Sequence, residues 1–256
     1  MHRSLGVVVP AFRPDVDRLR AYVEAIHDRL DPDVLRVELD APSRATVDAL
    51  ADLDATVATV PYRRGKGAAV TAGFEALETD VLCFLDADGS TPVASAARIV
   101  AALDDADLAV GSRRHPEATV TSHQTVARRF LGDGFAWVAR RLLDAHLYDY
   151  QCGAKAITRE AWEGVRQHLY EPGFAWDVEL VAMAAALDYR IAEVPIEWED
   201  QPGSTVSPVG TALDMGKALF VARHRAKRLQ NSRFHDALAT TREQPVALVD
   251  REEPEP

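Results

Sequence analysis

Residues 79–92 read TDVLCFLDADGSTP. The run from Asp80 to Leu85 is apolar after its first residue and has the length of a buried β-strand, which ends abruptly at Asp86-Ala87-Asp88-Gly89. Two carboxylates one residue apart at a strand end can bind a hard divalent cation and leave positions for phosphates and water. The same residues also suit a helix N-terminus, where acidic side chains stabilise by roughly 0.5–2 kcal/mol. The motif alone leaves both interpretations open.

The segments before this motif alternate between strand and helix patterns. We expect strands at 5–9 (stopped by Pro10), 34–39, 55–60 and 80–85, and helices at 15–30, 43–53 and 67–78. This order predicts an α/β fold with a mostly parallel central sheet flanked by helices. Ligands of such sheets bind at the carboxyl ends of the strands, where Pro10-Ala11-Phe12, Asp40, 63–67 and 86–88 all fall.

The second half of the chain has a less regular pattern. It predicts helices at 92–103, 126–143, 161–169, 178–187 and 211–229, with strands at 108–111 and 189–194. From about Asn231 the chain is polar and ends in DREEPEP. We therefore expect one Rossmann-like domain over residues 1–230 and a disordered acidic tail over 231–256.

Two basic groups suit an anionic ligand. The turn Arg63-Arg64-Gly65-Lys66-Gly67 opens a helix, and its backbone N–H groups, the helix dipole and a lysine all favour an anion. It lacks the spacing of a P-loop ATPase, and a solvated charged turn is the alternative. Arg113 and the pair at 128–129 form a second cationic group that could bind a phosphate with bidentate geometry, or simply be surface charge.

The bulk composition excludes several classes of protein. A net charge of −11 disfavours nucleic-acid binding. Cys83 and Cys152 are the only cysteines, which argues against a disulfide framework or a structural zinc site. No apolar run approaches the ~20 residues that span a bilayer, and no signal-peptide pattern opens the chain. We expect a cytoplasmic protein that is soluble or peripheral at the cytoplasmic face of a membrane.

The motifs taken together resemble one family. They are VVVPAF (7–12), RRGKGAAVTAGFEA (63–76), FLDADGSTP (84–92), VGSRR (110–114), ARRFLGDGF (127–135), YDYQCGAKAITREAW (148–162), FAWDVELVAMA (174–184) and EVPIEWEDQPGSTV (193–206). The series resembles family 2 glycosyltransferases of the GT-A fold, in the branch that makes polyprenyl (dolichyl) phosphate sugars. The segments 86–89 and 149–155 look more like dolichyl-phosphate glucosyltransferases than mannosyltransferases.

On the donor side, the resemblance implies a nucleoside pocket and a metal site. Its residues are Pro10, Ala11, Phe12 and Asp40 around the nucleoside, Arg63 and Lys66 beside the nucleotide, and Asp86 and Asp88 on Mg²⁺ or Mn²⁺. Ser90 would be a third metal ligand or a neighbour that hydrogen-bonds to one. Arg13-Pro14 and Asp40-Ala41 replace the residues common in the family at these strand ends, so the pocket around the base differs here.

On the acceptor side, the resemblance implies a phosphate site. Arg113 and Arg128 (or Arg129) would bind the acceptor phosphate, and Asp149, Gln151, Asp177 and Glu179 would shape the sugar side. Ser204 would lie in a mobile loop that closes over the diphosphate. Asp88, Arg113, Arg128 and Asp149 are the residues to which this assigns the chemistry.

The function implied is the transfer of a hexose from a UDP- or GDP-sugar to dolichyl (polyprenyl) phosphate, with inversion, feeding protein glycosylation. A phosphate monoester has a second pKa near ~6, so it needs positioning more than a base. A sugar-hydroxyl acceptor would instead need a carboxylate such as Asp149 or Asp177 to take its proton. The alternatives are a transferase that extends a lipid-linked or soluble saccharide, a nucleotidyltransferase that makes nucleotide-sugars, and a non-catalytic binding subunit.

A lipid acceptor requires contact with a membrane. Residues 217–233 interleave basic side chains with Leu219, Phe220, Val221 and Leu229. Such a segment can lie on an anionic leaflet, at about 1 kcal/mol per cation near the surface. An ordinary solvated helix packed on the domain is the alternative.

Overall fold

The computed structural model describes residues 3–121, 126–199, 208–230 and 245–251, with backbone alone at 126–131 and 208–214. Within them, seven strands form one sheet in the order β3-β2-β1-β4-β7-β5-β8. The strands are β1 (Leu5–Phe12), β2 (Val34–Asp40), β3 (Thr56–Val60), β4 (Val81–Leu85), β5 (Leu108–Ser112), β7 (Ala154–Thr158) and β8 (Ile191–Pro195). A separate pair is formed by β6 (Thr119–Val120) and β9 (Glu197–Trp198).

The first four strands are parallel, as the sequence predicts. β1 pairs with β2 and β4, and β2 pairs with β3, all in parallel. The prediction that Pro10 ends the first strand is wrong, because β1 continues to Phe12. β4 pairs with β1 only as far as Val8, so Pro10 lies where β2 alone flanks the strand, and proline is tolerated at such positions.

Within the seven-stranded sheet, the antiparallel strand β7 is the one that the sequence did not predict. It lies between β4 and β5 and is antiparallel to both, whereas β8 is parallel to β5. Its sequence, AKAIT, is interrupted by Lys155, a residue rarely buried. Lys155 is nonetheless buried here, and its partners are described with the site below.

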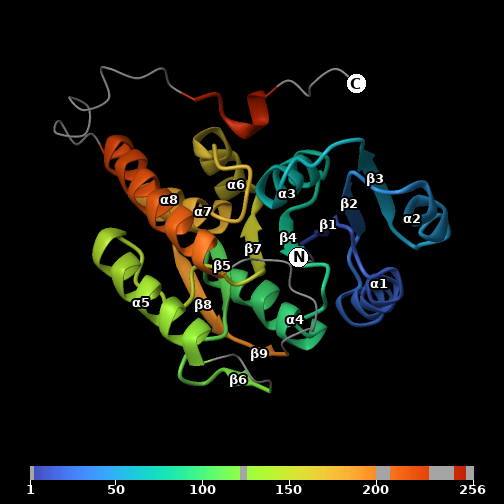
Figure 1. Cartoon of the computed structure of the whole chain (residues 1–256), viewed down its shortest axis with the longest axis horizontal. Helices are drawn as coiled ribbons and strands as arrows, with labels where there is room; N and C mark the ends of the chain where they lie inside the picture. Colours follow the sequence, from blue (N-terminus) through green and yellow to red (C-terminus); the bar gives the residue numbers. More distant parts are fainter. Residues whose placement is uncertain (1–2, 122–125, 200–207, 231–244, 252–256) are drawn as a thin grey trace.

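Helices cover both faces of the sheet (Figure 1). They are α1 (Val16–Leu30), α2 (Arg44–Ala49), α3 (Lys66–Glu75), α4 (Val93–Ala101), α5 (Val126–Leu142), α6 (Arg159–Val165), α7 (Trp176–Ala186) and α8 (Pro208–Leu229), with 3₁₀ turns η1 (Ala102–Asp104), η2 (Arg166–His168) and η3 (Leu248–Asp250). The expected helices are all present. The second is shorter than predicted, ending at Ala49, and the expected helix at 161–169 divides into α6 and η2.

Two hydrophobic cores follow from the alternation of side chains along β1. Val7 and Val9 point to the core shared with α1 and α4, whereas Val8 points to the core shared with α3, α6 and α7. α8 packs on α7 and on α5, and the α5–α8 pair lies beyond one end of the sheet in Figure 1. In the part of the chain that the structure describes, no helix is long and apolar enough to cross a bilayer.

Part of the expected acidic tail is folded onto the domain. Residues 245–251 include η3, and Leu248 is buried against the larger core. The Leu248 N–H donates to the Leu169 carbonyl at 2.8 Å. The prediction of disorder is wrong for this segment, because the side chains of Ala247 and Leu248 are buried against an apolar surface. Residues 231–244 and 252–256 lie outside the described residues.

Candidate active site

Asp86 and Asp88 lie on a tight turn at the carboxyl end of β4. Gly89 has a φ of 66°, which permits the turn, and Asp88 Oδ1 accepts a hydrogen bond from the Ser90 N–H at 2.9 Å. The Asp86 N–H donates to the Gly153 carbonyl at 2.8 Å, which fixes the start of the turn to the residue just before β7. Asp88 is exposed, and the Asp86 side chain keeps 39% of its exposure. Ser90 is buried beneath them.

A chain of alternating charges leads from Asp86 into the protein. Lys66 Nζ lies 3.0 Å from Asp86 Oδ1 and 2.8 Å from Asp177 Oδ2. Lys155 Nζ lies 2.5 Å from Asp177 Oδ1 and donates to the Cys152 carbonyl at 2.7 Å. Burial raises the pKa of Asp177, but the two ammonium groups lower it by more, so its pKa falls. Burial lowers the pKa of Lys66, and the two carboxylates raise it by more, so it stays charged.

Asp86 is the carboxylate that this network leaves least stabilised. Desolvation by the surrounding protein raises its pKa, Lys66 opposes that shift, and the nearby charges of Asp177 and Asp88 raise it further. A cation bound beside Asp86 and Asp88 would relieve this repulsion. The contacts above use Oδ1 of both residues, so among the described residues Oδ2 of each is left to ligate a cation, and carboxylate oxygens suit Mg²⁺ or Mn²⁺.

No group of three or more His, Cys, Asp or Glu side chains arranged for a metal occurs among the described residues. A divalent ion would take these two carboxylates as ligands, with Ser90 as the predicted third ligand or neighbour, and its other ligands from diphosphate oxygens and water. The two aspartates fit an ion that is bound together with a nucleotide.

Gly153 is the residue that lets Asp86 lie where it does. A Cβ atom added at Gly153 would come within 1.8 Å of Asp86 Oδ2 and 2.2 Å of its Cγ. The side chain of Asp86 therefore packs directly on the backbone just before β7. Only glycine leaves that space open.

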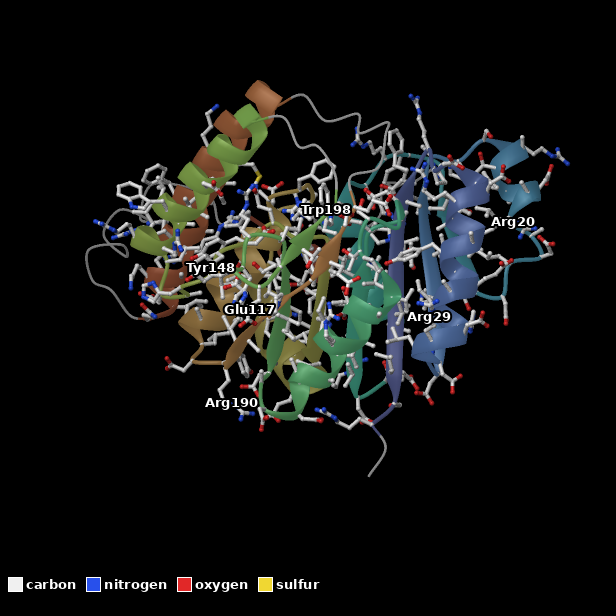
Figure 2. All side chains as sticks on the ribbon, turned by 90° about the horizontal axis from the view of Figure 1, so that it is seen from below. Arg20, Arg29, Glu117, Tyr148, Arg190 and Trp198 are labelled. Carbon is white, nitrogen blue, oxygen red and sulfur yellow. The ribbon has the colours of Figure 1, made fainter. Side chains whose placement is uncertain are left out.

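The half-buried Arg113 and the buried Asp149 form a bidentate pair. Arg113 Nε and Nη2 donate to the two Asp149 oxygens at 2.7 and 3.0 Å, and the backbone N–H of Gln151 donates to the same carboxylate at 3.0 Å. Burial raises the pKa of Asp149, but the charge and hydrogen bonds of Arg113 lower it by more, so that its pKa falls to about 2. The guanidinium carbon also lies 5.6 Å from the ring centre of Trp198, the last residue of β9, which Figure 2 labels.

These contacts do not suit a proton-accepting role for Asp149 or Asp177. A carboxylate with a depressed pKa, held by cations, is a weak base. Asp149 instead fixes the orientation of Arg113, which donates two of its five side-chain N–H groups to this carboxylate. The Asp86 charge contributes to the raised pKa of Arg113, so the arginine lies within electrostatic range of the turn that carries Asp86 and Asp88.

The basic turn at 63–67 is fixed by the carboxyl end of β2. Asp40 accepts hydrogen bonds from Arg64 Nε at 2.8 Å and from the Gly65 N–H at 2.9 Å. Arg63 lies over the Phe12 ring, with its guanidinium carbon 4.4 Å from the ring centre. Phe12 and Arg63 therefore line the turn side by side, whereas Asp40 is buried and serves as its anchor.

The structure does not bring every predicted residue to this place. Pro10 and Ala11 lie in β1 beside Phe12. Glu179 points to α8 and to residues 170–171 instead of to the Lys66 network. The side chains of Arg128 and Arg129, and all of Ser204, lie outside the described residues. Lys155 and Trp198 were missed, because a charged residue in an apolar strand and a single tryptophan carry no spacing signal.

The family model named glycosyl transferase family 2 matches residues 6–164. The chain belongs to this family. The matched region contains Lys66, Asp86, Asp88, Arg113 and Asp149, so it includes most of the site described above.

Among curated relatives, this glycosyltransferase is 34% identical to the mouse dolichyl-phosphate beta-glucosyltransferase over 188 residues, which are 69% of this chain and 58% of the relative. It is 29% identical to glycosyltransferase AglD of Haloferax volcanii over 229 residues, which are 85% of this chain and 36% of the relative. The matched chain thus spans about half the length, or less, of these relatives.

Solved structures confirm the GT-A fold. The glycosyltransferase aligns with glucosyl-3-phosphoglycerate synthase from Mycobacterium tuberculosis, crystallised with Mn²⁺, UDP-glucose and phosphoglyceric acid, with a TM-score of 0.68 and 18% identity over 86% of this chain and 80% of that one. Mannosyl-3-phosphoglycerate synthase from Rubrobacter xylanophilus gives a TM-score of 0.68 and 16% identity over 98% and 80%.

Proposed function

We propose that this glycosyltransferase transfers a hexose from a UDP- or GDP-sugar to a polyprenyl phosphate such as dolichyl phosphate, with inversion and with a divalent ion. The observation that carries the proposal is the arrangement at one sheet edge of Asp86 and Asp88, Lys66 and the Arg113–Asp149 pair. The names of the relatives, which include dolichyl-phosphate beta-glucosyltransferases, support a lipid phosphate as the acceptor.

The donor half of the reaction needs stabilisation of a leaving diphosphate. Asp86 and Asp88 would hold Mg²⁺ or Mn²⁺, which when bound supplies positive charge to the departing nucleoside diphosphate. Lys66 would add a second positive charge if the diphosphate draws it from its carboxylate partners. Phe12 and Arg63 would contact the nucleoside beside the basic turn.

The acceptor half needs orientation of a nucleophile that is already charged. A phosphate monoester is largely deprotonated at neutral pH, so no base is required and the buried, cation-held carboxylates are no obstacle. Arg113, held rigid by Asp149 and Trp198, would bind the phosphate and direct an oxygen at the anomeric carbon. Arg128 or Arg129 would supply a second guanidinium.

The acceptor lipid would be reached from the α5–α8 side of the molecule. Trp137 of α5 keeps 56% of its exposure and Phe220 of α8 keeps 60%, and Lys217 and Arg141 are exposed as well. Aromatic side chains next to basic ones suit the interface of an anionic leaflet. We propose that the protein lies at the cytoplasmic face of the membrane as a peripheral protein and that its product feeds protein glycosylation.

A transfer assay tests this function. The protein is incubated with Mg²⁺ or Mn²⁺ and a panel of labelled UDP- and GDP-sugars, with dolichyl phosphate in liposomes as the acceptor. We expect label from one donor to enter the organic phase, and chelation to stop it. Dolichol without phosphate is the matched control. Label that moves equally to dolichol would overturn the proposed acceptor.

A further inference from the structure

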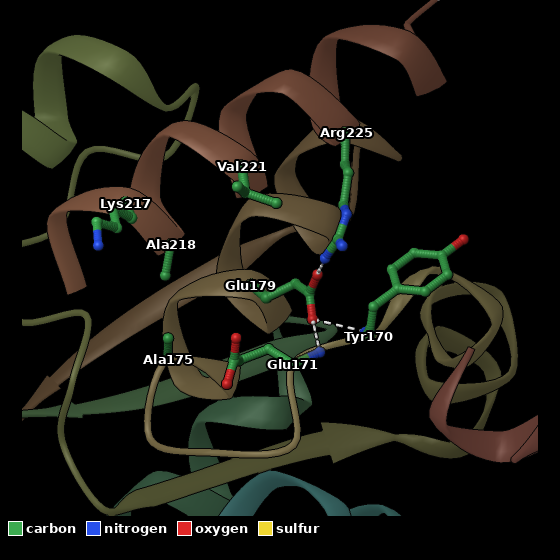
Figure 3. Close-up of a pocket in the computed structure, with 8 residues that line it drawn as sticks. All are labelled: Tyr170, Glu171, Ala175, Glu179, Lys217, Ala218, Val221 and Arg225. Carbon is green, nitrogen blue, oxygen red and sulfur yellow. Dashed lines mark hydrogen bonds and ion pairs between the residues drawn. The ribbon is translucent and has the colours of Figure 1, made fainter. Parts of the chain in front are cut away.

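Residues 169–175 form a short connection between η2 and α7, and Glu179 holds one side of it (Figure 3). Glu179 Oε2 accepts hydrogen bonds from the N–H groups of Tyr170 and Glu171 at 2.7 and 2.8 Å. Its other oxygen pairs with Arg225 of α8, whose guanidinium carbon lies 4.4 Å from the Tyr170 ring centre. The buried carboxylate thus fixes this connection to α7 and α8.

The same connection lies directly against the turn that carries Lys66. The Ala68 N–H donates to the Pro172 carbonyl at 3.1 Å. A Cβ atom at Gly65 would come within 2.5 Å of the Pro172 oxygen, and one at Gly67 within 2.6 Å of the Glu171 oxygen. The two backbones therefore touch, and a shift of residues 171–172 has to move the turn.

Residues 245–251 hold the connection from the other side. The Leu248 N–H donates to the Leu169 carbonyl at 2.8 Å, and Arg251 Nη2 donates to the Tyr170 carbonyl at 2.5 Å. Leu248 is buried, with 8% exposure, whereas its neighbour Val246 keeps 56%. η3 also packs on α3, the helix that begins at Lys66.

We propose that residues 245–251 act as a clasp that positions Lys66 for the nucleoside diphosphate. The contacts run from Leu248 and Arg251 to residues 169–170, from Pro172 to the turn, and from Lys66 to Asp86. The inference rests on the proposed function, since it assigns the clasp to the donor half of that reaction. Opening the clasp weakens donor binding, while the site of Arg113 and Asp149 keeps its own contacts.

The test compares Leu248→Asp with Val246→Asp, the same change of charge two residues away at an exposed position. Hydrogen exchange is followed at the Ala68 amide, whose bond to Pro172 reports on the turn. Binding of UDP and GDP with Mn²⁺ is measured by calorimetry, and KM is measured for donor and acceptor. Leu248→Asp is expected to speed exchange at Ala68 and weaken donor binding about tenfold, with the acceptor KM unchanged.

Two further variants serve as controls for this experiment. Leu248→Met keeps an apolar side chain at the buried position and is expected to keep wild-type donor affinity, whereas Val246→Asp controls for the added charge. Arg251→Ala removes an exposed side chain, so it serves if Leu248→Asp fails to fold, with a smaller shift in the same direction. Unchanged exchange at Ala68 in folded Leu248→Asp or Arg251→Ala, or equal losses in Val246→Asp, overturns the clasp. Failure of the wild type to bind either nucleotide would refute the proposed function. Hydrogen exchange at Ala68 would still show whether residues 245–251 hold the turn in place.

Discussion

Replacement of Gly153 by alanine should abolish metal-dependent transfer while leaving the fold intact. The added Cβ would lie 1.8 Å from Asp86 Oδ2, whereas ordinary contacts begin near 3.4 Å. The carboxylate therefore has to move by roughly 1.5 Å, and a misplacement of about 1 Å can lower a rate 10²-fold. Backbone atoms of β7 cannot give way as easily, because β7 is paired on both sides.

Gly134→Ala in α5 is the matched control, because its added Cβ meets nothing within 4 Å. Helix propensity predicts that this control is stabilised by up to about 1 kcal/mol and keeps full activity. Mn²⁺-dependent binding of the nucleoside diphosphate and sugar transfer are measured for both variants, with circular dichroism to confirm folding. A folded Gly153→Ala protein with wild-type affinity for Mn²⁺ and nucleotide would show that Asp86 does not hold the ion from this position.

The remaining predictions concern the acceptor site and the membrane. Asp149 has a pKa of about 2 against 3.8 for the ordinary group, so it stabilises the fold by about 2 kcal/mol above pH ~4, and this contribution is lost as the pH falls towards ~2. In urea unfolding, the stability gap between wild type and Asp149→Asn should shrink over that range; a constant gap would refute the depressed pKa. Arg113→Ala should raise the acceptor KM at least tenfold with little change in donor affinity, and unchanged acceptor kinetics would remove its assignment. Trp137→Ser together with Phe220→Ser should lower flotation with anionic liposomes, whereas binding that ignores anionic lipid would count against the α5–α8 surface.

The parallel half of the fold was predictable because its signals are local. Short apolar runs ending in turns gave four strands, and parallel topology then placed Asp40, Lys66 and Asp86 at one edge. β7 could not be predicted in the same way, because Lys155 breaks its apolar pattern and its charge is balanced by Asp177, 22 residues later. Which carboxylate pairs with a buried lysine is decided only when the chain folds, so the local sequence does not show it.

The residues of the site were more predictable than their contacts. The family motifs singled out Lys66, Asp149 and Asp177, but the sequence gives no sign that Lys66 pairs with Asp177, 111 residues away. Glu179 lies two positions after Asp177 on α7 and therefore points elsewhere, toward α8. The fold of residues 245–251 depends on an apolar surface that forms only when η2 and α3 are assembled. The apolar run at 246–249 is only four residues long and lies within a mostly polar segment, so it did not predict this contact.

Binding of Mn²⁺ in the presence of a nucleoside diphosphate tests the central claim most directly. Electron paramagnetic resonance counts free Mn²⁺ as UDP or GDP is added to the wild type and to the double variant Asp86→Asn/Asp88→Asn. We predict that the wild type binds one Mn²⁺ ion together with the nucleotide. The double variant should bind no more Mn²⁺ than the nucleotide binds in the absence of protein. Equal Mn²⁺ binding by both proteins would contradict the assignment of these two carboxylates.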